Sequence, residues 1–204
     1  MSKITSFMTG EVRWFLNRPI PEARRWFETL PPTSYTRESR TDIYLVLPGR
    51  SDLGVKFREN RLELKYRLGE HLAKEIAPGI IGCLESWEKL GFPSSQEITS
   101  SLLPGDSRTV RVPVLKRRLV TVIETTGTQT TFHPLGKPGA AGVQFEYTEL
   151  QVLGSDWYTL GMEWPENKSI TLPAGLLSDL LVGSVLEAPT SMGYPEFLQR
   201  MVYS

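Results

Sequence analysis

Lysine and arginine side chains recur, mostly two residues apart, along one segment of the chain, 55–67. One face of this segment carries one anion, Glu63, and five cations, which are Lys56, Arg58, Arg61, Lys65 and Arg67. Residues two apart on a strand point to the same side, so these charges lie close together and repel one another. The face has two interpretations. It is turned to water, where salt screens the repulsion over about 10 Å, or it lines a wet barrel interior where a multiply charged anion offsets the repulsion.

The register of a hairpin around residues 59–60 would position these cations. Asparagine tolerates positive φ, so a two-residue turn fits here. Phe57 then faces Leu62 on one side of the sheet, and Lys56 faces Glu63 on the other. A slip of one residue would set apolar side chains against charged ones on both faces, so this register is favoured.

The other elements follow from hydrophobic periodicity and from proline and glycine breaks. The pattern predicts strands over 11–16, 41–47, 108–126 (as two strands joined by a turn or bulge near Pro113), 143–153 and 157–164, the last two as a hairpin around 154–156. It predicts a loop over 94–106 and helices over 19–30 and 78–90, with two more carrying Leu176 to Leu181 and Tyr194 to Met201. The sum is one antiparallel, β-rich α+β domain spanning 1–204.

Composition excludes several classes of function. The 23 basic and 23 acidic residues cancel, so no net field attracts nucleic acid or an anionic membrane. No run is long and apolar enough to span a membrane, and the N-terminus lacks the apolar core of a signal peptide, which predicts a cytoplasmic protein. Cys83 is the single cysteine, and His71 and His133 lie far apart, so a disulfide or a His/Cys metal site is not expected.

Short motifs in order along the chain resemble those of the CYTH, or triphosphate tunnel, superfamily. The matching stretches are TGEVR at 9–13 (E-x-E-x-K in the family), Asp42 with Tyr44 (D-x-Y), Lys56 with Arg58 (L-R-x-R), Lys65 (T-x-K), Arg118 (K-K-R), Glu149 (the first acid of E-x-E) and GYPEFL at 193–198 (S-Y-x-x-L).

The resemblance implies a closed or nearly closed antiparallel barrel of about eight strands with flanking helices, whose basic interior binds an inorganic or organic triphosphate. It implies that acids hold Mg²⁺ or Mn²⁺ and that water attacks the phosphate. Carried onto this chain, the phosphate ligands are Arg13, Lys56, Arg58, Lys65, Arg67 and Arg118, and the metal ligands are Glu11, Glu63 and Glu149.

Two departures from the family pattern bear on catalysis. Thr9 and Gln151 stand where the family has acids, and neither brings a negative charge to a metal ion. Anion binding is therefore expected, with slow metal-assisted hydrolysis left open. The alternatives are an inactive protein of this fold acting as a binding or interaction module, and a lipocalin-like carrier with an apolar interior.

Several assignments stay open at the level of sequence. Glu149 is either a metal ligand or the ion-pair partner of a neighbouring arginine, and Asp42 is either a cavity residue or a strand-start residue bonded to nearby backbone. Which of Lys116, Arg117 and Arg118 faces inward is undecided. The oligomeric state is also open, a homodimer included.

Overall fold

A computed structural model describes residues 4–94, 109–139, 142–166, 175–177 and 186–203. Two sequence predictions, the loop over 94–106 and the helix carrying Leu176 to Leu181, lie mostly outside these ranges. Within them, no helix has the length and apolar character that crossing a membrane requires.

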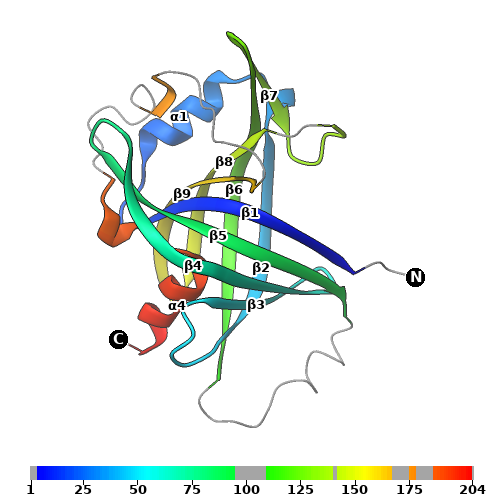
Figure 1. Ribbon diagram of the computed structural model, residues 1–204, viewed down its shortest axis with the longest axis vertical. Helices are drawn as coiled ribbons and strands as arrows, with labels where there is room; N and C mark the ends of the chain where they lie inside the picture. The colour runs from blue at the N-terminus through cyan, green and yellow to red at the C-terminus, as the bar shows by residue number, and fades with distance from the viewer. Residues whose placement is uncertain (1–3, 95–108, 140–141, 167–174, 178–185, 204) are drawn as a thin grey trace.

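Nine strands and two α-helices make up the described fold (Figure 1). The strands are β1 (Thr5–Leu16), β2 (Thr36–Val46), β3 (Leu53–Arg58), β4 (Arg61–Ala77), β5 (Ile80–Pro93), β6 (Val110–Thr126), β7 (Gln129–Pro134), β8 (Val143–Val152) and β9 (Ser155–Pro165). The helices are α1 (Pro21–Thr29) and α4 (Tyr194–Tyr203), with short 3₁₀ turns at Pro32–Ser34 and Ala188–Thr190.

The sheet closes on itself as an antiparallel barrel. Its strand order is β2-β3-β4-β5-β1-β9-β8-β6, and pairing of β2 with β6 completes a ring of eight strands. Strand β7 pairs with the distal part of β6, beyond the residues that β2 occupies. The prediction of a closed α+β barrel is confirmed, and the closure leaves one enclosed face on every strand.

The predicted 53–68 hairpin is confirmed, residue for residue. Phe57 pairs with Leu62 and Lys56 with Glu63, while Glu59 and Asn60 take the positive φ angles of 47° and 60° that a two-residue turn needs. The predicted β8–β9 hairpin is also present. Its turn lies at residues 153–154 rather than at 154–156, because Val152 already pairs with Ser155.

The helix predicted over 78–90 is wrong, because these residues form most of β5. Ile80, Leu84 and Trp87 match a helical stripe by spacing, yet the segment pairs with β4 on one edge and with β1 on the other. Backbone pairing on both edges outweighs local helical periodicity. The predicted break near Pro113 is also absent: β6 is continuous, and this proline lies just before the first residue that pairs with β8.

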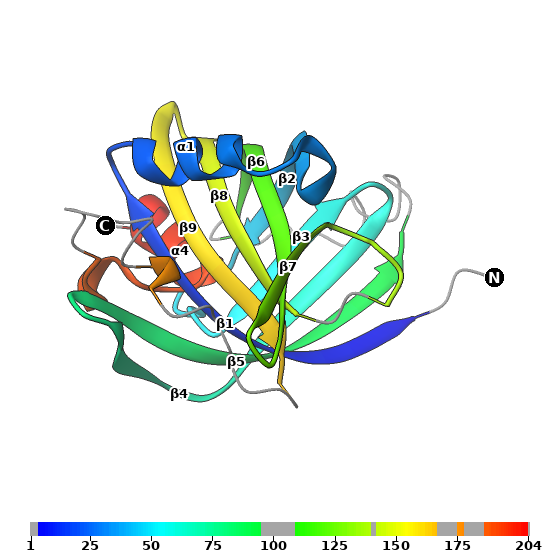
Figure 2. The same ribbon diagram turned by 90° about the horizontal axis from the view of Figure 1, so that it is seen from above.

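Two apolar clusters hold the barrel in shape. Helix α1 lies across the outside of β9, β8 and β6 (Figure 2), where Ala23 and Phe27 pack with residues such as Phe145 and Leu160. Helix α4 instead fills one end of the barrel interior. There Phe197 stacks on Phe15 with ring centroids 4.0 Å apart, among Tyr44, Val114 and other inward-facing residues.

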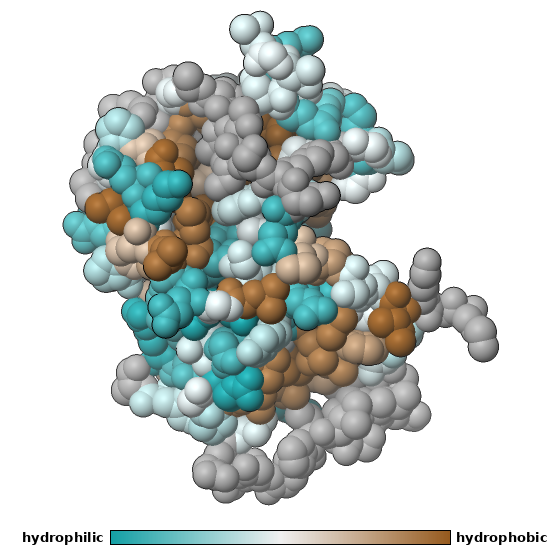
Figure 3. All heavy atoms as spheres, in the orientation of Figure 1, coloured by the Kyte–Doolittle hydropathy of each residue, from teal (hydrophilic) through white to brown (hydrophobic). Residues whose placement is uncertain are grey.

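The outer surface of β3 and of the β4 residues paired with it, with the adjoining end of β2, is apolar and partly exposed. Ile43 is 41% exposed and Tyr66 is 46% exposed, and neighbouring outward positions on β3 and β4 are also aliphatic or aromatic. Figure 3 shows a band of apolar residues crossing the lower half of the molecule. The cations that alternate with these apolar residues, Lys56, Arg58, Arg61 and Lys65, consequently point to the inside.

Candidate functional site

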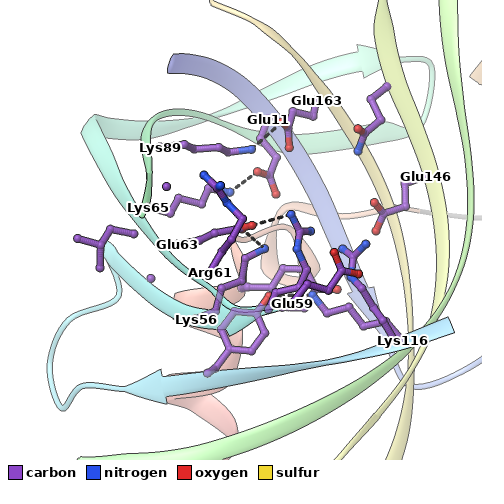
Figure 4. A pocket seen from close by; sticks show the side chains of 18 of the residues that line it. Glu11, Lys56, Glu59, Arg61, Glu63, Lys65, Lys89, Lys116, Glu146 and Glu163 are labelled. Carbon is purple, nitrogen blue, oxygen red and sulfur yellow. Dashed lines mark hydrogen bonds and ion pairs between the residues drawn. The ribbon is translucent and has the colours of Figure 1, made fainter. Parts of the chain in front are cut away.

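A charged cavity of about 490 Å³ occupies the barrel interior beyond the apolar end. Figure 4 shows charged side chains converging on it from strands on all sides. Nine basic residues and six glutamates line it. They are Arg13, Arg40, Lys56, Arg58, Arg61, Lys65, Lys89, Lys116 and Arg118, with Glu11, Glu38, Glu59, Glu63, Glu146 and Glu163.

Arg13 joins two buried carboxylates at the centre of this cavity. Its Nε donates to Glu11 Oε1 at 3.1 Å, and its Nη1 donates to Glu146 Oε1 at 2.9 Å and to Thr159 Oγ1 at 3.1 Å. Glu146 also accepts from Arg118 and from the Thr148 hydroxyl. All these charged groups are buried, so a fixed ion-pair network crosses β1, β8 and β6.

A second network forms the floor of the cavity beside α4. Lys116 Nζ lies 2.9 Å from Asp42 Oδ2, donates to the Tyr44 hydroxyl at 2.8 Å, and lies 3.8 Å from the centre of the Tyr194 ring. Arg40 donates to Asp42 Oδ1 at 3.1 Å. Asp42 therefore belongs to the cavity wall through its side chain and is not merely a strand-start residue.

Nearer the mouth, ammonium groups meet carboxylates. Lys56 and Arg58 both bind Glu63, at 2.8 Å and 2.6 Å. Lys65 binds Glu11 and lies 4.2 Å from the centre of the Trp87 ring. In these strands the acid sits between cations and reduces the repulsion expected from the sequence.

Lys89 and Arg61 complete the mouth. Lys89 lies 2.6 Å from Glu163. Arg61 donates to the Thr5 hydroxyl at 3.3 Å, and no carboxylate in the described part of the chain pairs with it. Among the described residues Arg61 is therefore a cation without a carboxylate partner, and it lies directly opposite Arg58 in the hairpin.

Electrostatics keep these acids ionised. Burial opposes ionisation of Glu146, but the charges of Arg118 and Arg13 outweigh it and hold the pKa of Glu146 well below its ordinary value. The pKa of Glu11 is also lowered, because the charges of Lys65 and Arg13 outweigh the effect of burial.

The cavity lysines are shifted in the direction expected for buried ammonium groups. Burial lowers the pKa of Lys56 and of Lys65, although nearby acids oppose the shift. Lys116, on the floor of the cavity, has a pKa well below its ordinary value. Burial is the main cause, and the negative charge of Asp42 opposes the shift.

The structure brings together most of the residues predicted from the sequence. Those lining the cavity are Arg13, Lys56, Arg58, Lys65 and Arg118 among the predicted phosphate ligands, and Glu11 and Glu63 among the predicted metal ligands. Of the three adjacent cations on β6, Lys116 and Arg118 face inward, whereas Arg117 is exposed.

Arg67 faces inward but belongs to a separate cluster beside α4. Its Nη1 lies 2.9 Å from Glu85 Oε1, 3.0 Å from His71 Nδ1 and 3.5 Å from Glu196 Oε2. The ligand atoms of the last three residues lie within 4.8 Å of one another, the spacing of a metal site. Because one guanidinium nitrogen contacts all three, a cation of the chain already fills that position.

Glu149 does not reach the cavity. Its carboxylate lies on the outer face of β8, 3.0 Å from Nη1 of the exposed Arg24 on α1, so the ion-pair alternative is the one the structure supports. Gln151, two residues on, is exposed and also faces outward. The departure at Gln151 therefore says nothing about the cavity.

The sequence analysis missed Glu146 because it expected Glu149 and Gln151 of β8 to point inward, and these residues belong to the opposite face of the strand. The inward residues are Gln144, Glu146 and Thr148, and the signal that could have located them was the alternation of outward Phe145 and Tyr147. Thr9-x-Glu11 on β1 and Glu146-x-Thr148 on β8 each present one acid and one threonine to the interior.

Comparison with known proteins identifies no family for this chain. No family model matches the chain, and no curated protein matches its sequence. Among solved structures, the chain is similar to the S. pombe Pct1 RNA triphosphatase in complex with the Spt5 CTD, with a TM-score of 0.38 and 8% sequence identity, covering 79% of this chain and 72% of that one.

Proposed function

We propose that this protein binds a polyphosphate anion of the triphosphate class inside the barrel. The observation that carries the proposal is the excess of cations in the cavity, where nine lysines and arginines face six glutamates and Asp42. A cavity with surplus positive charge is stabilised by an anion that reaches several cations at once. The motifs that resemble the CYTH superfamily support the same ligand class.

The shape of the site favours an extended, multiply charged ligand. The cations come from β1 to β6 and surround about 490 Å³, a volume in the range of small-molecule sites. Arginines such as Arg61 can hold phosphate oxygens in pairs, and lysines such as Lys65 act as point charges. Such a set discriminates against a monoanion, which could contact only part of the ring.

The Mg²⁺ or Mn²⁺ implied by the family resemblance fits the cavity poorly. These ions take hard oxygen ligands, and carboxylates are present. However, Glu11, Glu146 and Glu163 are each already paired with lysine or arginine. Thr9, in the place of a family acid, has a buried hydroxyl without a hydrogen-bond partner among the described residues, and it carries no charge. These paired acids are therefore not free to hold a metal ion for hydrolysis.

Arg61 offers the sharpest test of anion binding. Its replacement in Arg61→Gln removes one positive charge without leaving a buried acid unpaired. Calorimetric titration with tripolyphosphate should show binding by the native protein and about tenfold weaker binding by the variant, the value of one charged hydrogen bond. Lys74→Gln, on an exposed part of β4, is the matched control and should bind like the native protein.

Two results would count against the proposal. One is the absence of tripolyphosphate binding by the native protein. The other is equal affinity in the native protein and in variants of the cavity cations Lys56 and Arg58, each changed to alanine.

Phosphate release separates an enzyme from a binding module. Release should be measured with tripolyphosphate, ATP and thiamine triphosphate, with and without Mg²⁺ and Mn²⁺. The paired state of the cavity acids favours binding with no release. Release that depends on either metal would instead identify a triphosphatase.

A further inference from the structure

We infer that the barrel binds its polyanion without a divalent cation, because Arg13, Lys65 and Lys89 of the chain itself neutralise the carboxylates that such an ion would need. The inference rests on the proposed function and concerns the conditions under which the site works. It is carried by contacts at two places in the cavity, one at its centre and one nearer its mouth.

At the centre, the guanidinium of Arg13 stands between two carboxylates. Nε reaches Glu11 Oε1 at 3.1 Å and Nη1 reaches Glu146 Oε1 at 2.9 Å. An ion bridging acids from β1 and β8 would occupy this same place. Arginine stays protonated at any pH at which proteins remain folded, so it cannot yield the place by losing its charge.

Nearer the mouth, three side chains with oxygen atoms that could bind a metal ion form a row across three strands. Glu11 on β1 is in register with Glu163 on β9, which is in register with Gln144 on β8. Lys65 binds Glu11 and Lys89 binds Glu163, so an ammonium group sits on each acid of the row (Figure 4). The remaining donor, Gln144, is neutral.

Displacing these cations would be unfavourable. A metal ion bound by Glu11 and Glu146 would leave Arg13 buried without its partners, and an unpaired buried charge strongly destabilises a protein. Cations also outnumber glutamates in the cavity before any metal is added. A further positive ion raises that imbalance, whereas a phosphate anion lowers it.

The consequence is that Mg²⁺ should act on the ligand rather than on the protein. Polyphosphates bind Mg²⁺ in solution, and the complex carries two fewer negative charges than the free anion. The cavity offers fixed lysines and arginines as counter-charges, so it favours the free anion. Added Mg²⁺ should therefore compete with the protein for tripolyphosphate.

Titration with and without metal tests the inference. Tripolyphosphate is titrated into the native protein in EDTA and then in excess Mg²⁺ or Mn²⁺. The readouts are the heat and the total tryptophan fluorescence, to which Trp87, beside Lys65, contributes. We expect binding in EDTA and, because the chelated ligand is less charged, about threefold or greater weakening in metal. Binding seen only with metal would overturn the inference and leave the proposed function standing. No binding in either buffer would overturn both.

A gain of metal binding offers a second measurement. In Lys65→Met with Lys89→Met, both acids of the row lose an ammonium partner. We expect the double variant to bind Mn²⁺ in electron paramagnetic resonance titrations at least about tenfold more tightly than the native protein, because freed carboxylates are hard ligands. Lys74→Met is the control and should leave Mn²⁺ binding at the native level. Tight stoichiometric Mn²⁺ binding by the native protein would contradict the inference.

Discussion

The two ends of the barrel interior are built from the same strands but do opposite things. At one end α4 inserts Tyr194 and Phe197 against Phe15, and the interior is filled. At the other end β1 presents Phe7, which is 51% exposed, and the interior is a charged cavity. Along the inward face of β1 the side chains pass from Phe15 through Arg13 and Glu11 to Phe7.

This contrast shows how the fold supports a charged interior. Buried ion pairs contribute little net stability, since desolvation offsets their attraction. The apolar end and the outer layer under α1 provide the burial that stabilises the barrel. The charged half is therefore available to bind a ligand, and variants at the two ends should respond differently.

The largest expected effect comes from the central ion-pair network. Glu146→Gln leaves Arg13 and Arg118 without their shared carboxylate, and we expect the free energy of unfolding to fall by about 3 to 5 kcal/mol in denaturant titrations. The outward control Glu149→Gln breaks only a pair with exposed Arg24 and should change it by less than about 1 kcal/mol. Equal losses would contradict the inward parity of Glu146.

The second effect compares the filled end with the open end. Phe197→Ala removes the ring stacked on Phe15, which should cost about 3 kcal/mol of unfolding free energy. Phe7→Ala removes a half-exposed ring at the mouth and should cost well under about 1 kcal/mol. If the two variants were equally unstable, the end near Phe7 would be as packed as the end under α4.

The third effect is loss of stability in acid. Glu11, Glu146 and Asp42 have lowered pKa values in the folded state, because the charges of neighbouring lysines and arginines outweigh burial. As the pH falls, the carboxylates of the unfolded chain take up protons before those of the folded protein. The stabilisation from these three acids is therefore complete above about pH 4.5 and decreases below it. We expect the free energy of unfolding to be lower by about 2 kcal/mol or more at pH 3.

Glu85 opposes that trend. Burial and, next, the charge of Glu11 raise the pKa of Glu85 in the folded state. Glu85 therefore stabilises the folded protein at low pH, and this stabilisation is lost as the pH rises. Three carboxyl groups have lowered pKa values and Glu85 alone opposes them, so we expect the protein to be less stable in acid. Unfolding curves from pH 7 to pH 3 would measure it, and a flat profile would contradict the ion-pair account.

The smallest effect concerns binding in alkali. Burial lowers the pKa of Lys65 below its ordinary 10.5, so its charge is lost at a lower pH than that of a surface lysine. Affinity for tripolyphosphate should decline severalfold as the pH approaches 10.5, whereas Lys65→Arg should keep more of it, since arginine remains charged there. The same decline in both proteins would show that other groups set the pH dependence.

Local pattern was sufficient where neighbouring residues in the chain are also neighbours in space. The 53–68 hairpin could be predicted in full because its turn and both faces lie within one short segment. The same alternation placed Lys56, Arg58, Glu63 and Lys65 on one shared face, and the structure shows that this face is the inward one. Helices α1 and α4 were likewise visible as apolar stripes.

Long-range pairing decided the rest. Strand β5 lies between β4 and β1, and neither partner is visible in the spacing that predicted a helix over 78–90. Arg67 shares the parity of Lys65 but meets Glu196 of α4, far away in the sequence, and so leaves the cavity.

The sequence by itself determined which residues alternate, where the tight turn falls and how many cations share the face of one hairpin. Only the tertiary structure decided that Glu146 rather than Glu149 enters the barrel, that Arg13 joins it to Glu11, and that α4 fills one end. The reason is that a strand's alternation has two equivalent settings, and the choice between inside and outside is made only when the pairing of β2 with β6 closes the ring.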